Sequence, residues 1–144
     1  CQPETLETAS EFLAQLTAGK YRKIWTPLGE RRLRIDDEDQ QSFPVERLSN
    51  GTREQLFLAL RLAIVSAFAQ RGIELPMVLD DVLVNYDQSR TEAAMETLIE
   101  FADRGHQVLL FTCHLHLARL CESRGIDPVW LPGHQTALEH RRAG

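Results

Sequence analysis

Residues 47–64, RLSNGTREQLFLALRLAI, join a small polar turn to a strongly apolar segment. The spacing of the apolar side chains predicts an α-helix over about residues 52–70 that ends near Gly72. This helix is too apolar to face water, so we expect it inside the domain. The turn before it has two interpretations. Thr52 and Gln55 fit a capping box, which is purely structural, whereas unpaired N–H groups at a helix start form a natural phosphate site.

Composition sets the class of protein. The 144 residues are 43% hydrophobic and 26% charged, as in one soluble globular domain. The net charge of −5 predicts no global attraction to nucleic acid. No apolar run reaches the roughly 20 residues that span a bilayer, so we expect no membrane contact. The three cysteines are an odd number without framework spacing, which favours a reducing cytoplasm. The first residue is Cys rather than Met, so we expect a piece of a longer protein.

The rest of the chain predicts an α/β fold. Residues 4–18 have helical apolar spacing, and residues 20–46 contain three short β-leaning runs that predict a small antiparallel meander. MVLDD, residues 77–81, and QVLLFT, residues 107–112, are apolar without alternation, which is typical of strands buried on both faces of a parallel sheet. Between them, Ser89 and Glu92 fit a capping box that opens a helix to about Arg104, completing a βαβ unit.

Polar side chains follow both predicted parallel strands. Asp80 and Asp81 end the first strand, Asp87 lies in the loop beyond it, and His114 follows the second. Ligands of open α/β sheets bind beyond the carboxyl ends of the strands, so these residues are expected on one rim. A hard cation such as Mg²⁺ fits such carboxylates. Each residue also has a structural interpretation, because aspartates at such places cap helices and turns and a lone histidine is usually structural.

Three segments together resemble motifs of ABC-type ATPases. LSNGTREQLFLALRLA (residues 48–63) resembles the signature motif, LPMVLDDVLVNYD (residues 75–87) the Walker B strand with its D-loop, and VLLFTCH (residues 108–114) the switch histidine. The branch most similar contains SMC proteins, SbcC and YhaN-like bacterial ATPases. The resemblance covers roughly residues 20–131, and it is specific because three motifs occur in the family's order.

The resemblance implies a role for each matched residue. Asp80 would hold Mg²⁺ through water, Asp81 would take the place of the general base, and His114 would reach the γ-phosphate of ATP. Asp87 would lie at the interface between two heads. The signature residues, which would contact the γ-phosphate of ATP held by a second head, are Ser49, Asn50 and Gly51.

The chain departs from the family pattern in three ways. Asp81 stands where Glu is usual, and the shorter side chain suggests slow hydrolysis or a water-relayed base. Asn50 and Thr52 replace commoner signature residues. No G-x-x-x-x-G-K-[ST] P-loop occurs in the chain. In this family the P-loop belongs to an N-terminal lobe that a long coiled coil separates from the C-terminal lobe.

The resemblance therefore implies the C-terminal lobe of an ATPase head, in three parts. Residues 1–19 would end the coiled-coil arm, residues 20–132 would form the lobe, and residues 133–144 a polar tail. The expected cofactors are ATP and Mg²⁺, and the isolated lobe should be inactive as an ATPase. Expected partners are the N-terminal P-loop lobe and a second head in a homodimer, with DNA and a nuclease subunit in DNA repair or processing.

Two other site chemistries compete with this interpretation. A metal-dependent phosphohydrolase or nuclease would use Asp80, Asp81 and Asp87 directly, as two-metal sites need converging carboxylates. Adjacent strand residues point to opposite faces, so the first two converge only if the strand ends between them. Zinc is a further alternative, but the spacing of its four candidate ligands matches no common finger. Those candidates are Cys113, His114, His116 and Cys121.

A basic cluster early in the chain predicts contact with nucleic acid. Its cations alternate with Tyr21 and Trp25, a pattern that suits binding to a phosphate backbone. The structural interpretation, a solvated hairpin beside the acidic residues 36–39, fits equally well. The candidate DNA-binding residues are Lys20, Arg22, Lys23, Arg31 and Arg32.

Overall fold

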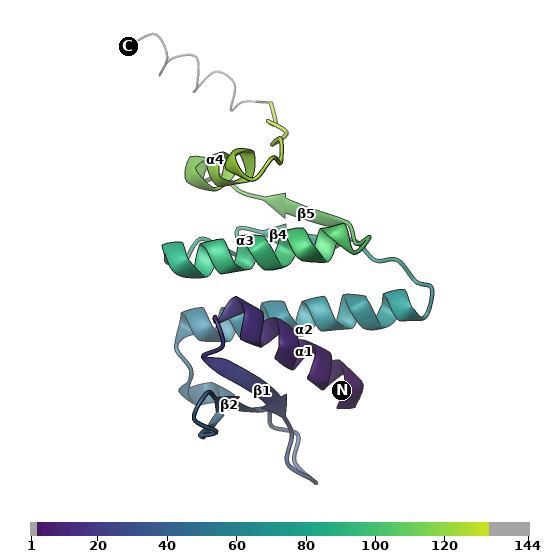
Figure 1. Ribbon diagram of the computed structural model, residues 1–144, viewed down its shortest axis with the longest axis vertical. Coiled ribbons are helices and arrows are strands. Elements are labelled where there is room, and N and C mark those ends of the chain that lie inside the picture. The colour runs from purple at the N-terminus through teal and green to yellow at the C-terminus, as the bar shows by residue number, and fades with distance from the viewer. Residues whose placement is uncertain (1–2, 133–144) are drawn as a thin grey trace. The chain divides into compact units, whose positions relative to one another are not determined.

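The computed structural model describes residues 3–132 and shows helices together with two small sheets (Figure 1). In chain order the elements are α1 (Pro3–Leu16), β1 (Tyr21–Trp25), β2 (Arg34–Asp37), β3 (Ser42–Pro44), the single 3₁₀ turn η1 (Val45–Arg47), α2 (Asn50–Gln70), β4 (Met77–Asp80), α3 (Gln88–Asp103), β5 (Val108–Phe111) and α4 (Leu115–Ser123). The α/β class predicted from the sequence is confirmed.

The chain divides into two compact units, residues 1–111 and residues 112–144. The first unit holds both sheets and the helices α1, α2 and α3, and the second holds α4. Among the described helices, none combines the length and apolar character that a bilayer crossing requires. The tail predicted over residues 133–144 lies outside the described residues.

Three helices share the core of the first unit. The buried face of α1 consists of Ala9, Phe12, Leu13 and Leu16, at the i, i+3, i+4, i+7 spacing of one helical stripe. Helix α1 lies against α2, and Phe12 meets Phe101 of α3 edge to face with ring centroids 5.9 Å apart. These contacts gather α1, α2 and α3 around one hydrophobic core.

The predicted antiparallel meander is confirmed by the sheet β1–β2–β3. Ile24 and Ile35 are cross-strand partners and both are buried, so one face of the sheet joins the core. The sheet is fastened to α1, because the Ile24 N–H donates to the Ser10 hydroxyl at 2.9 Å. The middle of α1 and the end of β1 are therefore joined directly.

The predicted βαβ unit is also confirmed, with β4 and β5 parallel on either side of α3 in sequence. Its strands differ from expectation in burial. Met77 and Leu79 are buried, whereas Val78 between them is 44% exposed. Leu109, the cross-strand partner of Val78, is exposed as well. The expectation of strands buried on both faces is wrong for the described chain, because its elements cover one face of this sheet and leave the other open.

Candidate functional site

The turn at residues 49–51 is built by Ser49, which is the N-cap of α2. Its Oγ accepts from the Thr52 N–H at 3.2 Å, and its hydroxyl donates to the Thr52 Oγ1 at 2.9 Å. The helix therefore starts at Asn50, and the capping box predicted for Thr52 and Gln55 is wrong. The N–H groups of Asn50 and Gly51 have no acceptor inside the helix, as at any helix start. The turn thus keeps two donors for an anion while Ser49 satisfies a third.

Gln55 has a different role from the one the sequence suggested. Its side chain is 2% exposed, and Nε2 donates to the Leu16 carbonyl at 2.8 Å. Leu16 is the last residue of α1, whose final carbonyls lack partners within the helix. The amide of Gln55 therefore ties the first turns of α2 to the end of α1, across 39 residues of sequence.

The two adjacent aspartates adopt different backbone conformations. Strand β4 ends at Asp80, and Asp81 has a φ of 51°, in the left-handed region that non-glycine residues seldom adopt. The Asp81 N–H donates to the Phe111 carbonyl at 3.0 Å, which fixes this conformation beside the end of β5. Both residues are exposed. Such strain at a strand end is typical of positions where side-chain direction matters.

Asp87 is the N-cap of α3. Its Oδ1 accepts from the Arg90 N–H at 2.8 Å, so the helix begins at Gln88. The capping box predicted for Ser89 and Glu92 is therefore wrong. The Oδ2 atom of Asp87 lies 3.8 Å from the Arg90 Nε, which leaves the carboxylate exposed but held by one residue at two points.

Arg90 also meets the turn at residues 49–51. A methyl group built on Gly51 would overlap the Arg90 guanidinium, lying 3.1 Å from its Cζ, so Gly51 leaves room for this side chain. A second link joins the same segments, because the Asn85 Nδ2 donates to the Glu54 Oε1 at 3.2 Å. Sequence analysis missed Arg90, although opposite charges at Asp87 and Arg90, three residues apart, were a usable signal.

Tyr86 lies between these links and is buried. Burial raises the pKa of its hydroxyl far above the ordinary value, the Glu54 carboxylate raises the pKa further, and Arg90 opposes both effects. The hydroxyl is thus held neutral between an acidic side chain of α2 and a basic side chain of α3. Residues 85–87 are packed onto the start of α2.

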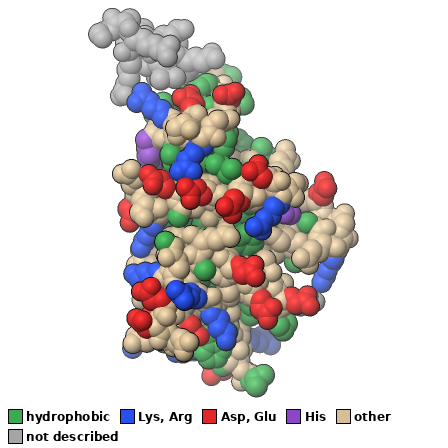
Figure 2. All heavy atoms as spheres, viewed as in Figure 1, with side chains coloured by type: hydrophobic (Ala, Val, Ile, Leu, Met, Phe, Trp, Pro, Cys, Tyr) green, Lys and Arg blue, Asp and Glu red, His purple; other side chains and the backbone are tan. Residues whose placement is uncertain are grey.

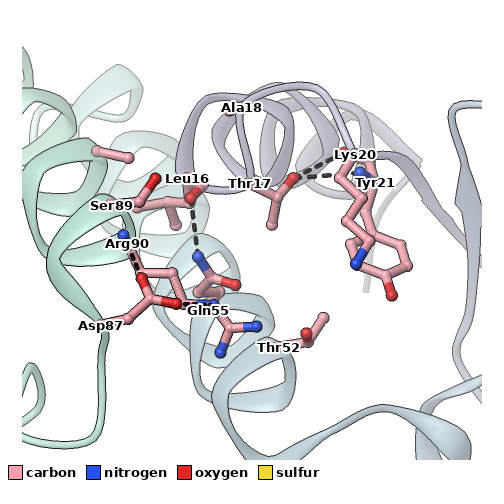
Figure 3. A pocket seen from close by; sticks show the side chains of 11 residues that line it. Leu16, Thr17, Ala18, Lys20, Tyr21, Thr52, Gln55, Asp87, Ser89 and Arg90 are labelled. Carbon is pink, nitrogen blue, oxygen red and sulfur yellow. Dashed lines mark hydrogen bonds and ion pairs between the residues drawn. The ribbon is translucent and has the colours of Figure 1, made fainter.

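A cavity of about 210 Å³ opens where these elements meet. Figure 3 shows Gln55 reaching toward Leu16 on one side and Arg90 lying beside Asp87 on the other. The polar and charged residues that line the cavity include Thr17, Lys20, Thr52, Gln55, Asp87 and Arg90. The end of α1, the start of α2 and the start of α3 therefore form one junction.

The aspartates do not assemble into a single metal centre. Within residues 3–132, no group of three that includes Asp80, Asp81 and Asp87 offers oxygens within 4.8 Å of one another. The strand does end between the first two, as convergence would require, but Asp87 is engaged as a helix cap. The geometry gives the nuclease alternative no support.

His114 lies in the second unit, at the N-cap position of α4. Its backbone N–H donates to the Thr112 Oγ1 at 3.0 Å, and its ring centroid is 5.6 Å from that of His116. In the described part of this unit, no three of the candidate zinc ligands bring their donor atoms within 4.8 Å. Burial raises the pKa of the Cys121 thiol, which disfavours the thiolate that binds metal.

The five candidate DNA-binding residues are all exposed. Lys20, Arg22 and Lys23 lie at or in β1, and Arg31 and Arg32 lie in the loop before β2. On the face drawn in Figure 2, acidic and basic side chains are intermixed, without a broad basic surface. On this face, any attraction to nucleic acid would therefore be local.

Comparison with known protein sequences finds a relative of this chain in Bacillus subtilis. No family model matches the sequence. The chain is 37% identical over 115 residues to the uncharacterized protein YhaN of Bacillus subtilis (strain 168), which covers 80% of this chain and 12% of that protein. The chain thus spans about an eighth of this relative's length.

Solved structures of similar fold include SMC heads. The SMC head domain from Thermotoga maritima has a TM-score of 0.62 at 18% identity, covering 83% of this chain and 41% of that one. A structure described under ATP-driven dimerization and DNA-stimulated activation of SMC ATPases has a TM-score of 0.62 at 16% identity, covering 79% and 70%. The SMC head bound to the C-winged helix domain of ScpA has a TM-score of 0.63 at 15% identity, covering 81% and 36%.

Proposed function

This chain has the fold of part of an SMC head and is related in sequence to a segment of YhaN, and from that premise we propose that it is the C-terminal lobe of an ATP-binding and ATP-hydrolysing head. The observation that carries the proposal is the junction in the first unit, where the turn at residues 49–51 contacts the segment at residues 85–90. In the proposed head, both segments face a second head across a shared nucleotide.

The signature turn suits a phosphate of ATP. The unpaired N–H groups of Asn50 and Gly51 lie at the positive end of α2, which attracts an anion. Ser49 is exposed, and its hydroxyl, which donates to the Thr52 Oγ1 here, would be available to donate to a phosphate. Asp87 would meet the second head beside this turn.

The residues after the two parallel strands complete the proposed site. The exposed carboxylate of Asp80 is a fitting ligand for Mg²⁺, directly or through water. When bound, Mg²⁺ neutralises charge on phosphate oxygens. Asp81 would accept a proton from the attacking water as general base, with a shorter reach than Glu, so hydrolysis should be slow. His114 would contact the γ-phosphate.

The open face of the sheet β4–β5 suits the missing P-loop lobe. The cross-strand partners Val78 and Leu109 are both exposed there, and Phe111 extends the same apolar edge. On α2, Phe57, Ile64 and Phe68 form an exposed stripe, and Arg61 between them donates to the Val78 carbonyl at 2.5 Å. Contiguous apolar surface of this kind marks an interface. We assign it to the N-terminal lobe of the same protein.

The relatives suggest what the whole protein does. One of the similar SMC structures is described with ATP-driven dimerization and DNA-stimulated activation, and another with ScpA. For this protein we propose a homodimer of heads that closes on ATP and opens on hydrolysis, moving arms that continue α1. The proposed biological setting is DNA repair or processing in the cytoplasm, with DNA and a nuclease subunit as partners.

The decisive experiment compares this chain with the full protein that contains a P-loop lobe. We expect ATP hydrolysis by the full protein and none by the isolated chain. In the full protein, Asp81→Asn should abolish hydrolysis while ATP-dependent pairing of heads persists, whereas Ser49→Arg should abolish pairing. Asp39→Asn, in the exposed turn before β3, is the matched control for Asp81→Asn and should change neither.

Two activities of the isolated chain would refute the proposal. ATP hydrolysis by the isolated chain that disappears in Asp80→Ala would show a complete site in this chain and contradict a site shared between lobes. Nuclease activity of the isolated chain with Mn²⁺ or Mg²⁺ would instead restore the carboxylate-centred alternative.

A further inference from the structure

We propose that Arg90 is a positioning residue that fixes the signature turn to Asp87, so that both present themselves to the second head in one arrangement. This inference rests on the proposed function, since it concerns how the same site is held. Neither the motifs nor the comparisons assign any role to Arg90. The geometry points to it because its side chain contacts both elements that the proposed site needs.

The first contact is with the turn. The guanidinium of Arg90 occupies the space where a side chain at residue 51 would begin. The absence of a side chain at Gly51 therefore leaves room for the close approach of Arg90, besides any approach of a phosphate. The second contact is with Asp87, whose two carboxylate oxygens face the backbone N–H and the Nε of Arg90 at 2.8 and 3.8 Å. Figure 3 shows the Arg90 side chain between Asp87 and the start of α2.

The position of the Arg90 guanidinium beside the start of α2 is unusual for a cation. The start of α2 carries the positive end of the helix dipole, where a cation is normally unfavourable. The carboxylate of Asp87 compensates the guanidinium, so the two are held as a pair beside the turn. When an anion binds at residues 49–51, Arg90 adds favourable charge close to it. The arrangement therefore suits anion binding better than it suits the stability of the empty chain.

The solvent exposure of the Arg90–Asp87 pair distinguishes a positioning role for Arg90 from a role in the stability of the fold. The side chains of Arg90 and Asp87 are 31% and 66% exposed, and such surface pairs contribute little to stability. Loss of Arg90 should thus leave the unfolding midpoint of the protein almost unchanged. Its effect should appear in the ATP concentration needed to pair the heads, because the turn and Asp87 are no longer held together.

The test uses the full-length protein and measures ATP-dependent head pairing, hydrolysis and thermal unfolding. We expect Arg90→Ala to raise the ATP concentration for half-maximal pairing about tenfold, the size of a typical coupling between sites. Arg90→Lys should restore part of the loss, because Lys keeps the charge but lacks the planar fork. Arg104→Ala removes the same charge just beyond the far end of α3 and should behave as the unaltered protein.

A double-mutant cycle with Gly51 makes the test specific. Gly51→Ala displaces the guanidinium, so adding Arg90→Ala to it should cause no further loss. Multiplicative losses in the double variant, or an unchanged ATP requirement in Arg90→Ala, would overturn the inference. If the unaltered protein shows no ATP-dependent pairing, the proposed function itself fails, and if it pairs normally while the Arg90 effects are missing, this inference alone fails.

Discussion

The amide of Gln55 shows how one buried polar group can organise a junction. Its hydrogen bond to the Leu16 carbonyl connects two helices that meet at the cavity beside the signature turn. A buried acceptor that loses its donor keeps the whole cost of leaving water. The contact is therefore important for the local structure even though it is a single bond.

We predict that Gln55→Met, which keeps the length of the side chain but removes its donor, destabilises the chain by about 1–3 kcal/mol. The free energy of unfolding in urea measures the effect. Gln70→Met, at the exposed end of the same helix, is the matched control and should change the free energy of unfolding by less than about 0.5 kcal/mol. Equal effects in both variants would show that the bond to Leu16 is not what matters.

Tyr86 predicts a pH dependence. An unfolded tyrosine loses its proton near pH 10, but burial raises the pKa of Tyr86 in the folded chain. Above pH 10 the unfolded state therefore binds fewer protons than the folded state, and stability falls as pH rises. We expect Tyr86→Phe to lose less stability than the unaltered chain between about pH 9 and 11. Tyr21→Phe is the control; parallel pH profiles for Tyr86→Phe and the unaltered chain would refute the prediction.

Helix starts show what the sequence could and could not predict at the residue scale. The sequence located both helices, yet it misplaced both caps. Asp87 and Ser89 are both residue types that cap helices, and Glu92 three residues after Ser89 favoured the later start in the sequence. In the folded chain the helix begins after Asp87, where Arg90 packs against Gly51 at the start of α2. That contact joins residues about forty positions apart in the sequence. Gln55 was misassigned for the same reason, since its true partner lies in α1.

Whole elements were predicted better than their ends. The meander and the βαβ unit follow from short β-leaning runs and a helical segment between apolar runs, and both are present. The prediction that failed was that β4 is buried on both faces. An apolar run shows that a strand can be buried on both faces, but the elements that bury it need not belong to the same chain segment. Val78 is 44% exposed among the described residues.

The exposed stripe of α2 leads to a prediction about association. We expect the isolated chain to self-associate through this surface, because contiguous apolar area outside an assembly is covered by other copies. Replacing Phe57 and Ile64 by Lys should lower the average mass measured by sedimentation, with little loss of stability. Leu28→Lys is the control: Leu28 is fully exposed in the loop between β1 and β2, away from the stripe. An unchanged mass in the double variant would contradict the assignment of this face.

For the whole molecule, charge decides whether DNA contact is plausible. A net charge of −5 repels a polyanion at long range, so binding by this chain would depend on a local group of cations such as those near β1. Acidic side chains lie close by, since Asp36 and Asp37 are cross-strand partners of Lys23 and Tyr21. Association should therefore be weak and highly sensitive to salt, unlike binding to a broad basic surface.

We predict that DNA binding by the full protein falls steeply with added salt, because each phosphate contact releases counterions. Replacing Lys20, Arg22 and Lys23 together by Gln should weaken binding and flatten the slope of log affinity against log salt by about 3, since each contact contributes about 0.9 to that slope. Fluorescence anisotropy with a labelled duplex, at several salt concentrations, provides both quantities. A control variant removes three exposed arginines that are distant from β1 in the sequence, namely Arg71, Arg104 and Arg119, and lowers the net charge equally. If both variants flatten the slope alike, the effect is one of net charge; if neither does, the residues around β1 are a solvated hairpin and the DNA contact lies elsewhere in the protein.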